Sequence, residues 1–77
     1  MMKYDIRSMV GLRIKELRYE RSISQESFAN DIGMARTYFA EVETGKRNVS
    51  MLNLEKIIKG LGVSHKEFFD SELFKPE

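Results

Sequence analysis

The segment from Ser24 to Gly45 constrains the fold of this chain more strongly than any other. Two short helices that meet at a steep angle through a tight turn need a small side chain where their backbones approach, and Ala29 supplies it. Gly33 follows with the left-handed conformation that such a turn requires. Phe39 and Val42 then pack one face of the second helix against the core. This joint spacing predicts two helices in a fixed relative orientation, with the outer face of the second helix left free.

The whole chain is predicted to be an all-α, compact five-helix bundle. Apolar residues recur at steps of three and four, which is the spacing of amphipathic helices. The five stretches are Asp5–Arg21, Gln25–Ile32, Ala35–Thr44, Met51–Leu61 and the residues from Ser64 onward. Ser24, Ser50 and Ser64 are expected N-caps, and Glu67 completes a capping box with Ser64.

Each predicted helix has an apolar side that faces the core. In the first helix this side comprises Ile6, Met9, Val10, Ile14 and Leu17. Arg13, Lys15 and Arg21 are expected on its solvated side.

Length and composition exclude several classes of protein. Seventy-seven residues predict one domain, residues 1–77, and a chain this short buries only about 60% of its unfolded surface. With no cysteine and one histidine, His65, neither a disulfide nor a metal site is expected. The chain has no histidine–nucleophile–acid set, no carboxylates clustered at a motif spacing and no glycine-rich phosphate loop, so we expect no enzyme and no cofactor. Association between copies remains as a source of further burial.

The distribution of charge and hydropathy indicates which part of the chain would contact nucleic acid and argues against a membrane partner. Residues 1–50 carry nine Lys and Arg against seven Asp and Glu, whereas residues 51–77 carry four against five. A nucleic-acid contact therefore belongs on the first two-thirds of the chain. No apolar run approaches the roughly 20 residues of a membrane span, and the charged N-terminus is unlike a signal peptide. A cytoplasmic protein is expected, with no membrane partner and no evident small-molecule ligand.

The quoted segments resemble the Cro/repressor (XRE-type) helix-turn-helix family. The likeness runs from about Val10 to Phe69, and includes Glu-Thr-Gly-Lys-Arg-Asn after the paired helices and Leu-Gly-Val-Ser before the last helix. Arg36-Thr37-Tyr38, Lys46-Arg47-Asn48 and Phe68-Phe69 are most similar to the controller proteins of restriction–modification systems. The resemblance implies a lambda-repressor-like DNA-binding domain whose helix-turn-helix, residues 24–45, places its second helix in the major groove.

The resemblance also implies which side chains contact bases. Arg36 would donate a bidentate pair to guanine, and Thr37 would meet a base edge or a thymine methyl group. Tyr38 contacts a phosphate or a base, or else packs at the rim of the bundle. Ala35 touches a methyl group or only begins the helix. Glu41 accepts from cytosine N4, or it repels phosphates.

Contacts with the DNA backbone are implied on both sides of this helix. Ser24 and Gln25 lie at the start of the preceding helix, whose positive end favours phosphate, and the amide of Gln25 is similar to the phosphate clamp of the family. Lys46, Arg47 and Asn48 follow in the next loop, where Arg47 also has the option of the minor groove. The alternative for all of them is a solvated surface side chain.

The family pattern pairs Arg18 with Glu43. We expect this pair to be a structural brace that fixes the second helix of the motif against the first helix of the chain, since buried pairs give orientation more surely than stability.

The last third of the chain carries more apolar residues than a short tail needs. Leu52 belongs to this set, and Phe68 is assigned to the core. The dimerisation surface is predicted within residues 61–74, with contacts from Leu61, Val63, Phe69, Leu73 and Phe74. Two-fold pairing predicts two half-sites with centres about 34 Å apart, or a multiple of that, on one face of the duplex.

The sequence therefore predicts a homodimeric transcriptional regulator that binds a (pseudo)palindromic double-stranded operator, with the controller of a restriction–modification operon as the narrower role. An antitoxin or protein-interaction module that has the same fold and autoregulates its operon is the alternative. Only about eight residues follow Phe69, and antitoxin arms tend to be longer.

Overall fold

The computed structural model describes residues 5–76, which form five α-helices and one short 3₁₀ helix. The elements are α1 (Ile6–Glu20), α2 (Gln25–Asp31), α3 (Arg36–Glu43), α4 (Met51–Gly60), α5 (His65–Phe69) and η1 (Glu72–Phe74). No strand occurs among the described residues, and the predicted all-α fold of five helices is confirmed. η1 was not predicted. Nowhere in residues 5–76 is a helix long and apolar enough to cross a membrane.

The helix ends differ from the predicted ones by one residue, because the predicted terminal residues are caps. The residues concerned are Asp5, Arg21, Ile32, Ala35, Thr44 and Leu61. The predicted N-caps form: the hydroxyls of Ser24 and Ser50 each accept from a backbone N–H at 3.1 Å. The capping box of α5 is complete, since the Glu67 carboxylate accepts from the Ser64 N–H at 2.9 Å. This backbone hydrogen bond lowers the pKa of the Glu67 carboxyl.

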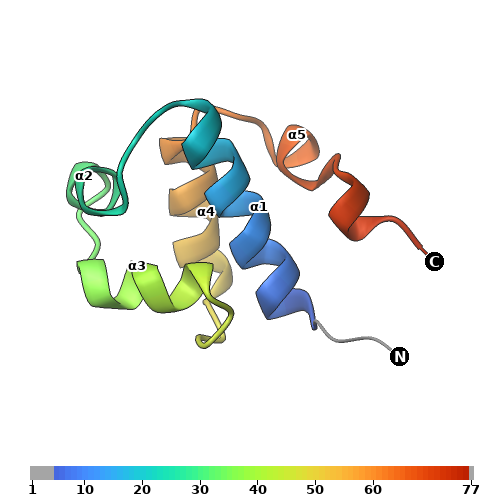
Figure 1. Cartoon of the computed structure of the whole chain (residues 1–77), viewed down its shortest axis with the longest axis horizontal. Helices are drawn as coiled ribbons and strands as arrows, with labels where there is room; N and C mark the ends of the chain where they lie inside the picture. Colours follow the sequence, from blue (N-terminus) through green and yellow to red (C-terminus); the bar gives the residue numbers. More distant parts are fainter. Residues whose placement is uncertain (1–4, 77) are drawn as a thin grey trace.

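The helices enclose one core. α1 and α4 run through the centre, with α2 and α3 at one end of the molecule and α5 with η1 on the opposite side of α1 (Figure 1). The buried apolar residues are Val10, Ile14, Leu17, Phe28, Ala29, Phe39, Val42, Ile57, Ile58, Leu61 and Phe68. The rings of Phe28 and Phe39 lie 5.2 Å apart and join α2 to α3. Ile6 was wrongly predicted to face the core: it lies in the first turn of α1 and is 56% exposed, whereas the core begins at Val10.

α1 and α3 approach so closely that only glycine fits at Gly11. A Cβ atom there would overlap the Glu43 carbonyl oxygen and lie 2.6 Å from that of Val42. Ala29, the small residue predicted from the sequence, is buried, whereas the need for glycine at position 11 was not predicted. A glycine in a helix interior lowers helix propensity, and that was the available signal.

Arg13 corrects a second expectation. It was predicted on the solvated side of α1, but its guanidinium donates to the carbonyls of Phe68 at 2.7 Å and Glu67 at 2.8 Å. These two carbonyls end α5, so Arg13 ties the last helix to the first. Lys15 and Arg21 are exposed as predicted.

Candidate nucleic-acid interface

The turn between α2 and α3 has the geometry that the sequence predicted. Gly33 has φ +68°, and no atom lies within 4 Å of where its Cβ would be. Glycine is therefore needed here for the left-handed backbone and not for space. The N–H of Met34 donates to the carbonyl of Ala29 at 2.8 Å and closes the turn. The direction of α3 relative to α2 is thus fixed by backbone geometry.

A buried ion pair fixes α3 against α1. Arg18 Nε donates to Glu43 Oε2 at 2.6 Å and Arg18 Nη2 to Glu43 Oε1 at 2.9 Å. Arg18 Nη1 also donates to the carbonyl of Ile23 at 2.7 Å. The hydrogen bond with Glu43 raises the pKa of the Arg18 guanidinium, against the opposing effect of burial. The pair joins the end of α3 to α1 and to the loop before α2.

Gln25 belongs to this brace. Its side-chain Nε2 donates to Glu43 Oε1 at 2.9 Å, a contact that the sequence analysis missed when it assigned Gln25 to phosphate. A side-chain amide has two N–H donors, and Glu43 takes one of them. Ser24 is exposed beside it, with its hydroxyl engaged in capping α2.

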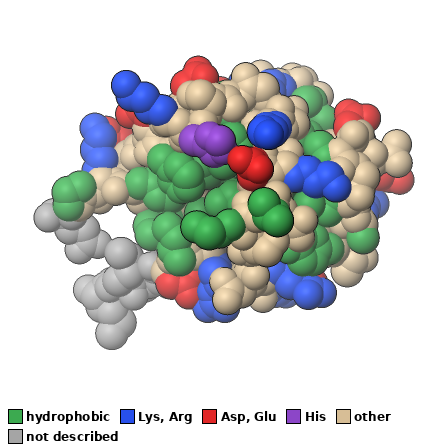
Figure 2. Space-filling model, turned by 180° about the vertical axis from the view of Figure 1, so that it is seen from behind, with side chains coloured by type: hydrophobic (Ala, Val, Ile, Leu, Met, Phe, Trp, Pro, Cys, Tyr) green, Lys and Arg blue, Asp and Glu red, His purple; other side chains and the backbone are tan. Residues whose placement is uncertain are grey.

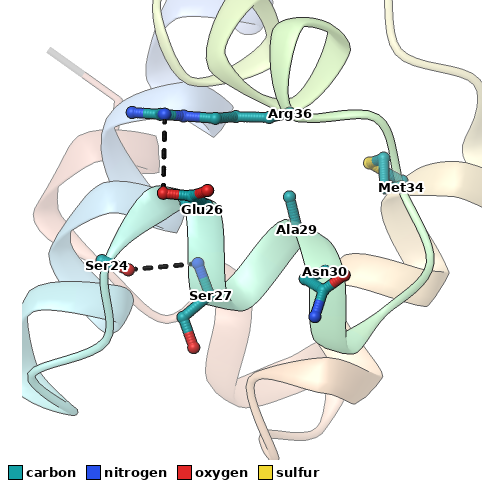
Figure 3. A pocket seen from close by; sticks show the side chains of 7 residues that line it. All are labelled: Ser24, Glu26, Ser27, Ala29, Asn30, Met34 and Arg36. Atoms are coloured by element: carbon teal, nitrogen blue, oxygen red, sulfur yellow. Dashed lines mark hydrogen bonds and ion pairs between the residues drawn. The ribbon is translucent and has the colours of Figure 1, made fainter.

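The start of α3 presents exposed side chains next to α2. Arg36 and Thr37 are exposed, and Ala35 is the N-cap of α3, with no side-chain hydrogen bond. The Arg36 side chain extends across the start of α2, where its Nη1 lies 3.7 Å from Glu26 Oε1 (Figure 3). Beneath it is an open hollow of about 570 Å³, bordered by α2 and by Met34 of the turn.

Arg47, in the loop after α3, contacts two residues of α3. Its Nε donates to Glu41 Oε1 at 2.7 Å, and its guanidinium lies over the Tyr38 ring, 5.1 Å from the centroid. Tyr38 is half-buried, and its hydroxyl accepts from Asn53 Nδ2 at 3.1 Å. Of the expectations for Tyr38, packing at the rim of the bundle is therefore observed. We call Tyr38, Glu41 and Arg47 the Arg47 cluster.

The predicted contact residues thus lie on one continuous surface. Thr37 and Glu41 are one helical turn apart, which places them on the same side of α3. Glu26 extends this surface to α2 through Arg36, and Arg47 extends it into the loop, where Lys46 and Asn48 are exposed. We call this surface the α3 face. Its two arginine–glutamate contacts were not predicted, because they depend on side-chain positions across elements.

Comparison with known proteins identifies the family. A model described as Helix-turn-helix matches residues 14–68 of this chain. The chain belongs to the helix-turn-helix family of the Cro/repressor (XRE) type.

Relatives of this helix-turn-helix chain include regulatory proteins of restriction–modification systems. It is 52% identical to the control protein C.MunI of a Mycoplasma species over 84% of this chain and 89% of the relative. It is 41% identical to the control protein C.BamHI of Bacillus amyloliquefaciens over 90% of this chain and 86% of the relative. The predicted resemblance to controller proteins is confirmed.

A solved structure of the family has the same fold. The restriction–modification controller protein C.Esp1396I, solved as a tetramer in complex with its natural operator, is similar to this chain with a TM-score of 0.81 and 37% identity. The match covers 88% of this chain and 90% of that one. Variants of C.Esp1396I in consecutive arginine, threonine and tyrosine residues have also been solved. These residue types have the order of Arg36, Thr37 and Tyr38 here.

The residues predicted for dimer contacts in this helix-turn-helix domain fall into three groups by exposure. Leu61 was wrongly assigned: it caps α4 and is only 2% exposed, because its side chain completes the core. Val63, Leu73 and Phe74 are half-buried, and the Phe74 ring packs 5.1 Å from that of Phe69. Among these five, Phe69 is the most exposed, at 41%.

The most exposed apolar side chains lie instead at the start of α4. Met51 is 87% exposed and Leu52 is 78% exposed. Together with Phe69 they border a groove of about 310 Å³, and Figure 2 shows hydrophobic side chains gathered here beside His65. The sequence analysis missed Met51. The N-cap Ser50 was the signal, since it places Met51 and Leu52 in the first turn, outside the stripe of Leu54, Ile57 and Ile58.

Proposed function

We propose that this chain is a sequence-specific, double-stranded-DNA-binding transcriptional regulator that acts as a homodimer on a (pseudo)palindromic operator. The observation that carries the proposal is the rigid mounting of α3, with Arg36 and Thr37 exposed at its start. A helix mounted in this way fits the major groove with its N-terminal residues toward the bases. The relative C.Esp1396I, 37% identical, has been solved in complex with its operator.

The narrower role is control of a restriction–modification operon. The support is the similarity to the control proteins C.MunI and C.BamHI over most of both chains. The antitoxin alternative gains no support from these relatives. We further propose that residues 1–77 are a single non-enzymatic domain that acts in the cytoplasm of a prokaryotic cell, as expected of a transcriptional regulator.

The roles of individual residues follow from their place on the α3 face. Arg36 donates to guanine, and Thr37 contacts an adjacent base. Tyr38 and Ala35 lie beside them and shape the edge of the contact. The backbone contacts come from Ser24 and Gln25 on one side and from Lys46, Arg47 and Asn48 on the other.

The dimer contact is proposed for the groove between α4 and α5. Met51, Leu52 and Phe69 expose apolar side chains here, and an exposed apolar patch marks an interaction site in a small domain. The Phe74 ring packs against Phe69, and Val63 packs against the core, so this revises the predicted surface.

The DNA-binding proposal is tested by selecting a binding site from a random duplex library and measuring affinity for it. Arg36→Ala removes the guanine contact, so we expect an affinity loss of about 1–3 kcal/mol and relaxed preference at one base pair per half-site. Lys66→Ala, the loss of an exposed cation on α5, is the matched control and should have little effect. Equal behaviour of the two variants would argue against α3 as the recognition helix.

The dimer proposal is tested by sedimentation of the Leu52→Lys variant. We expect weakened association, because a charge would be buried in an apolar contact. Ile6→Lys places the same charge on an exposed apolar position of α1 and should leave the dimer intact. Dimers that persist in Leu52→Lys would move the interface elsewhere.

A further inference from the structure

We propose that Glu41 is a specificity-determining residue that acts by withholding Arg47 from non-operator DNA. The inference rests on the proposed function and deepens it. In the free chain the Glu41 carboxylate neutralises Arg47 and holds it on Tyr38. Arg47 becomes available to a phosphate only when α3 is seated in the groove of a matching site.

The geometry of the Arg47 cluster carries this inference. Glu41 and Tyr38 engage Arg47 from two directions, through the 2.7 Å hydrogen bond and the 5.1 Å ring contact. Tyr38 is itself fixed by Asn53 of α4. The arginine of the loop therefore lies against α3 with its Nε occupied by a carboxylate, although half of its side chain stays exposed. A phosphate must replace the carboxylate before Arg47 contributes to binding.

The consequence differs between operator and other DNA. Non-specific binding depends on the number of phosphates that cations neutralise, so an arginine occupied by a carboxylate is lost to it. At about 0.1 M salt, charges interact over roughly 10 Å, and Glu41 on the same surface also repels the duplex. On an operator, the base contacts of Arg36 and Thr37 set the register and bring a phosphate to the loop. These base contacts favour the exchange of Glu41 for a phosphate at Arg47. A random sequence does not provide them.

A second arginine–glutamate contact, longer than that of Arg47 with Glu41, lies at the other end of the α3 face. Arg36 faces Glu26 at 3.7 Å, with no second partner comparable to Tyr38 among the contacts of the described residues. Both arginines of the face are thus accompanied by a carboxylate, in agreement with the small charge excess of residues 1–50, nine Lys and Arg against seven Asp and Glu. We expect Glu26 to act in the same direction as Glu41 but with a smaller effect.

The test compares the wild type with Glu41→Gln on the selected operator and on a scrambled duplex of the same length, across a salt series. For the scrambled duplex we expect affinity to rise about three- to fivefold, and the salt dependence to steepen by about one phosphate contact. For the operator we expect less than about a twofold change. Glu72→Gln makes the same charge change on η1, away from α2 and α3 (Figure 1), and should leave the preference unchanged.

A double variant separates this mechanism from a general charge effect. If Glu41 acts by holding Arg47, Glu41→Gln should no longer add a phosphate contact to the salt dependence of scrambled-duplex binding in an Arg47→Ala background, and only the smaller relief of direct repulsion should remain. An effect of the same size in that background would overturn the inference.

Other outcomes are also decisive. Reduced operator affinity in Glu41→Gln, with scrambled binding unchanged, would overturn the inference and make Glu41 a base contact. A wild type that prefers no sequence would instead contradict the proposed function itself.

Discussion

Two arginine–glutamate pairs of nearly equal length lie in opposite surroundings in this protein. Arg18 and Glu43 approach to 2.6 Å with side chains 6% and 1% exposed, whereas Arg47 and Glu41 approach to 2.7 Å with side chains 51% and 38% exposed. The first pair joins α1 to the end of α3, and the second lies on the α3 face. Distance alone therefore does not assign a role to an ion pair.

The surroundings decide because water and neighbouring groups compete for the same charges. Around Arg18 and Glu43, the carbonyl of Ile23 and the amide of Gln25 replace the lost water. Removing one member of such a pair strands a buried charge. Around Glu41 and Arg47, water remains able to solvate either partner, so the contact breaks at little cost. The buried pair fixes α3 against α1, and under the proposed function the exposed pair controls whether Arg47 is available to DNA.

The largest expected effect comes from breaking the buried pair. Arg18→Met leaves the Glu43 carboxylate buried without its cation, and we expect the free energy of unfolding to fall by about 3–5 kcal/mol. Urea unfolding followed by circular dichroism measures this loss, which is large for a domain of 77 residues.

The double variant Arg18→Met/Glu43→Leu is the control for this prediction. It removes both charges and keeps an apolar volume, so most of the lost stability should return. A double variant as unstable as the single one would mean that the loss comes from packing and not from the stranded charge.

The second prediction concerns the backbone contact on which the buried pair depends. Gly11→Ala pushes α3 away from α1, and we expect a loss of about 1–3 kcal/mol in the free energy of unfolding. The direction of the change in unfolding free energy is informative, because Gly→Ala in an exposed helix interior would raise it by roughly 1 kcal/mol.

Gly60→Ala provides a matched comparison in the same assay. A Cβ at Gly60 meets side-chain atoms, Ile32 Cγ2 at 2.6 Å and Phe28 Cζ at 3.1 Å, instead of backbone. Side chains adjust more readily than a carbonyl, so the loss should be smaller than at Gly11. The reverse order would contradict the close approach of α1 and α3.

The same contrast explains how much of the fold was predictable. The caps at Ser24, Ser50 and Ser64 and the turn at Gly33 were predicted because each depends on neighbours within a few residues. Arg13 was misassigned because its partners, the carbonyls that end α5, are more than fifty positions away in the chain. Helical spacing gives the face of a residue, but it does not give what another helix brings to that face.

The residues of the candidate site likewise divide into those that were predicted from the sequence and those that were missed. Arg36 and Thr37 were predicted to be free at the start of α3, and they are exposed. The Arg18–Glu43 contact came from the family pattern, not from spacing. The contacts of Gln25 with Glu43 and of Arg47 with Glu41 were missed, since polar side chains in different elements have many alternative partners. Exposed apolar residues are similarly ambiguous, and Leu61 was assigned to the dimer surface while Met51 was overlooked.

The third prediction concerns a carboxylate whose partner is backbone. The hydrogen bond from the Ser64 N–H lowers the pKa of Glu67 from its usual 4.5. A lowered pKa in the folded state means that the stabilisation is complete above the unfolded value and is lost as the pH falls through the folded value. The difference in unfolding free energy between the wild type and Glu67→Gln should therefore be constant near neutral pH and shrink below pH 4.5. A difference that does not change with pH would assign the effect to shape and not to charge.

The smallest expected effect on stability comes from breaking the exposed pair of Arg47 and Glu41. Glu41→Gln removes a charge from a contact as short as the buried one, yet the free energy of unfolding should change by less than about 0.5 kcal/mol, because water and salt screen an exposed pair. The same urea titration that detects Arg18→Met measures it, and repeating it at high salt should reduce the change further. A loss approaching that of Arg18→Met would mean that the Arg47 cluster is part of the structural frame, and Arg47 would then not be available for exchange with a phosphate.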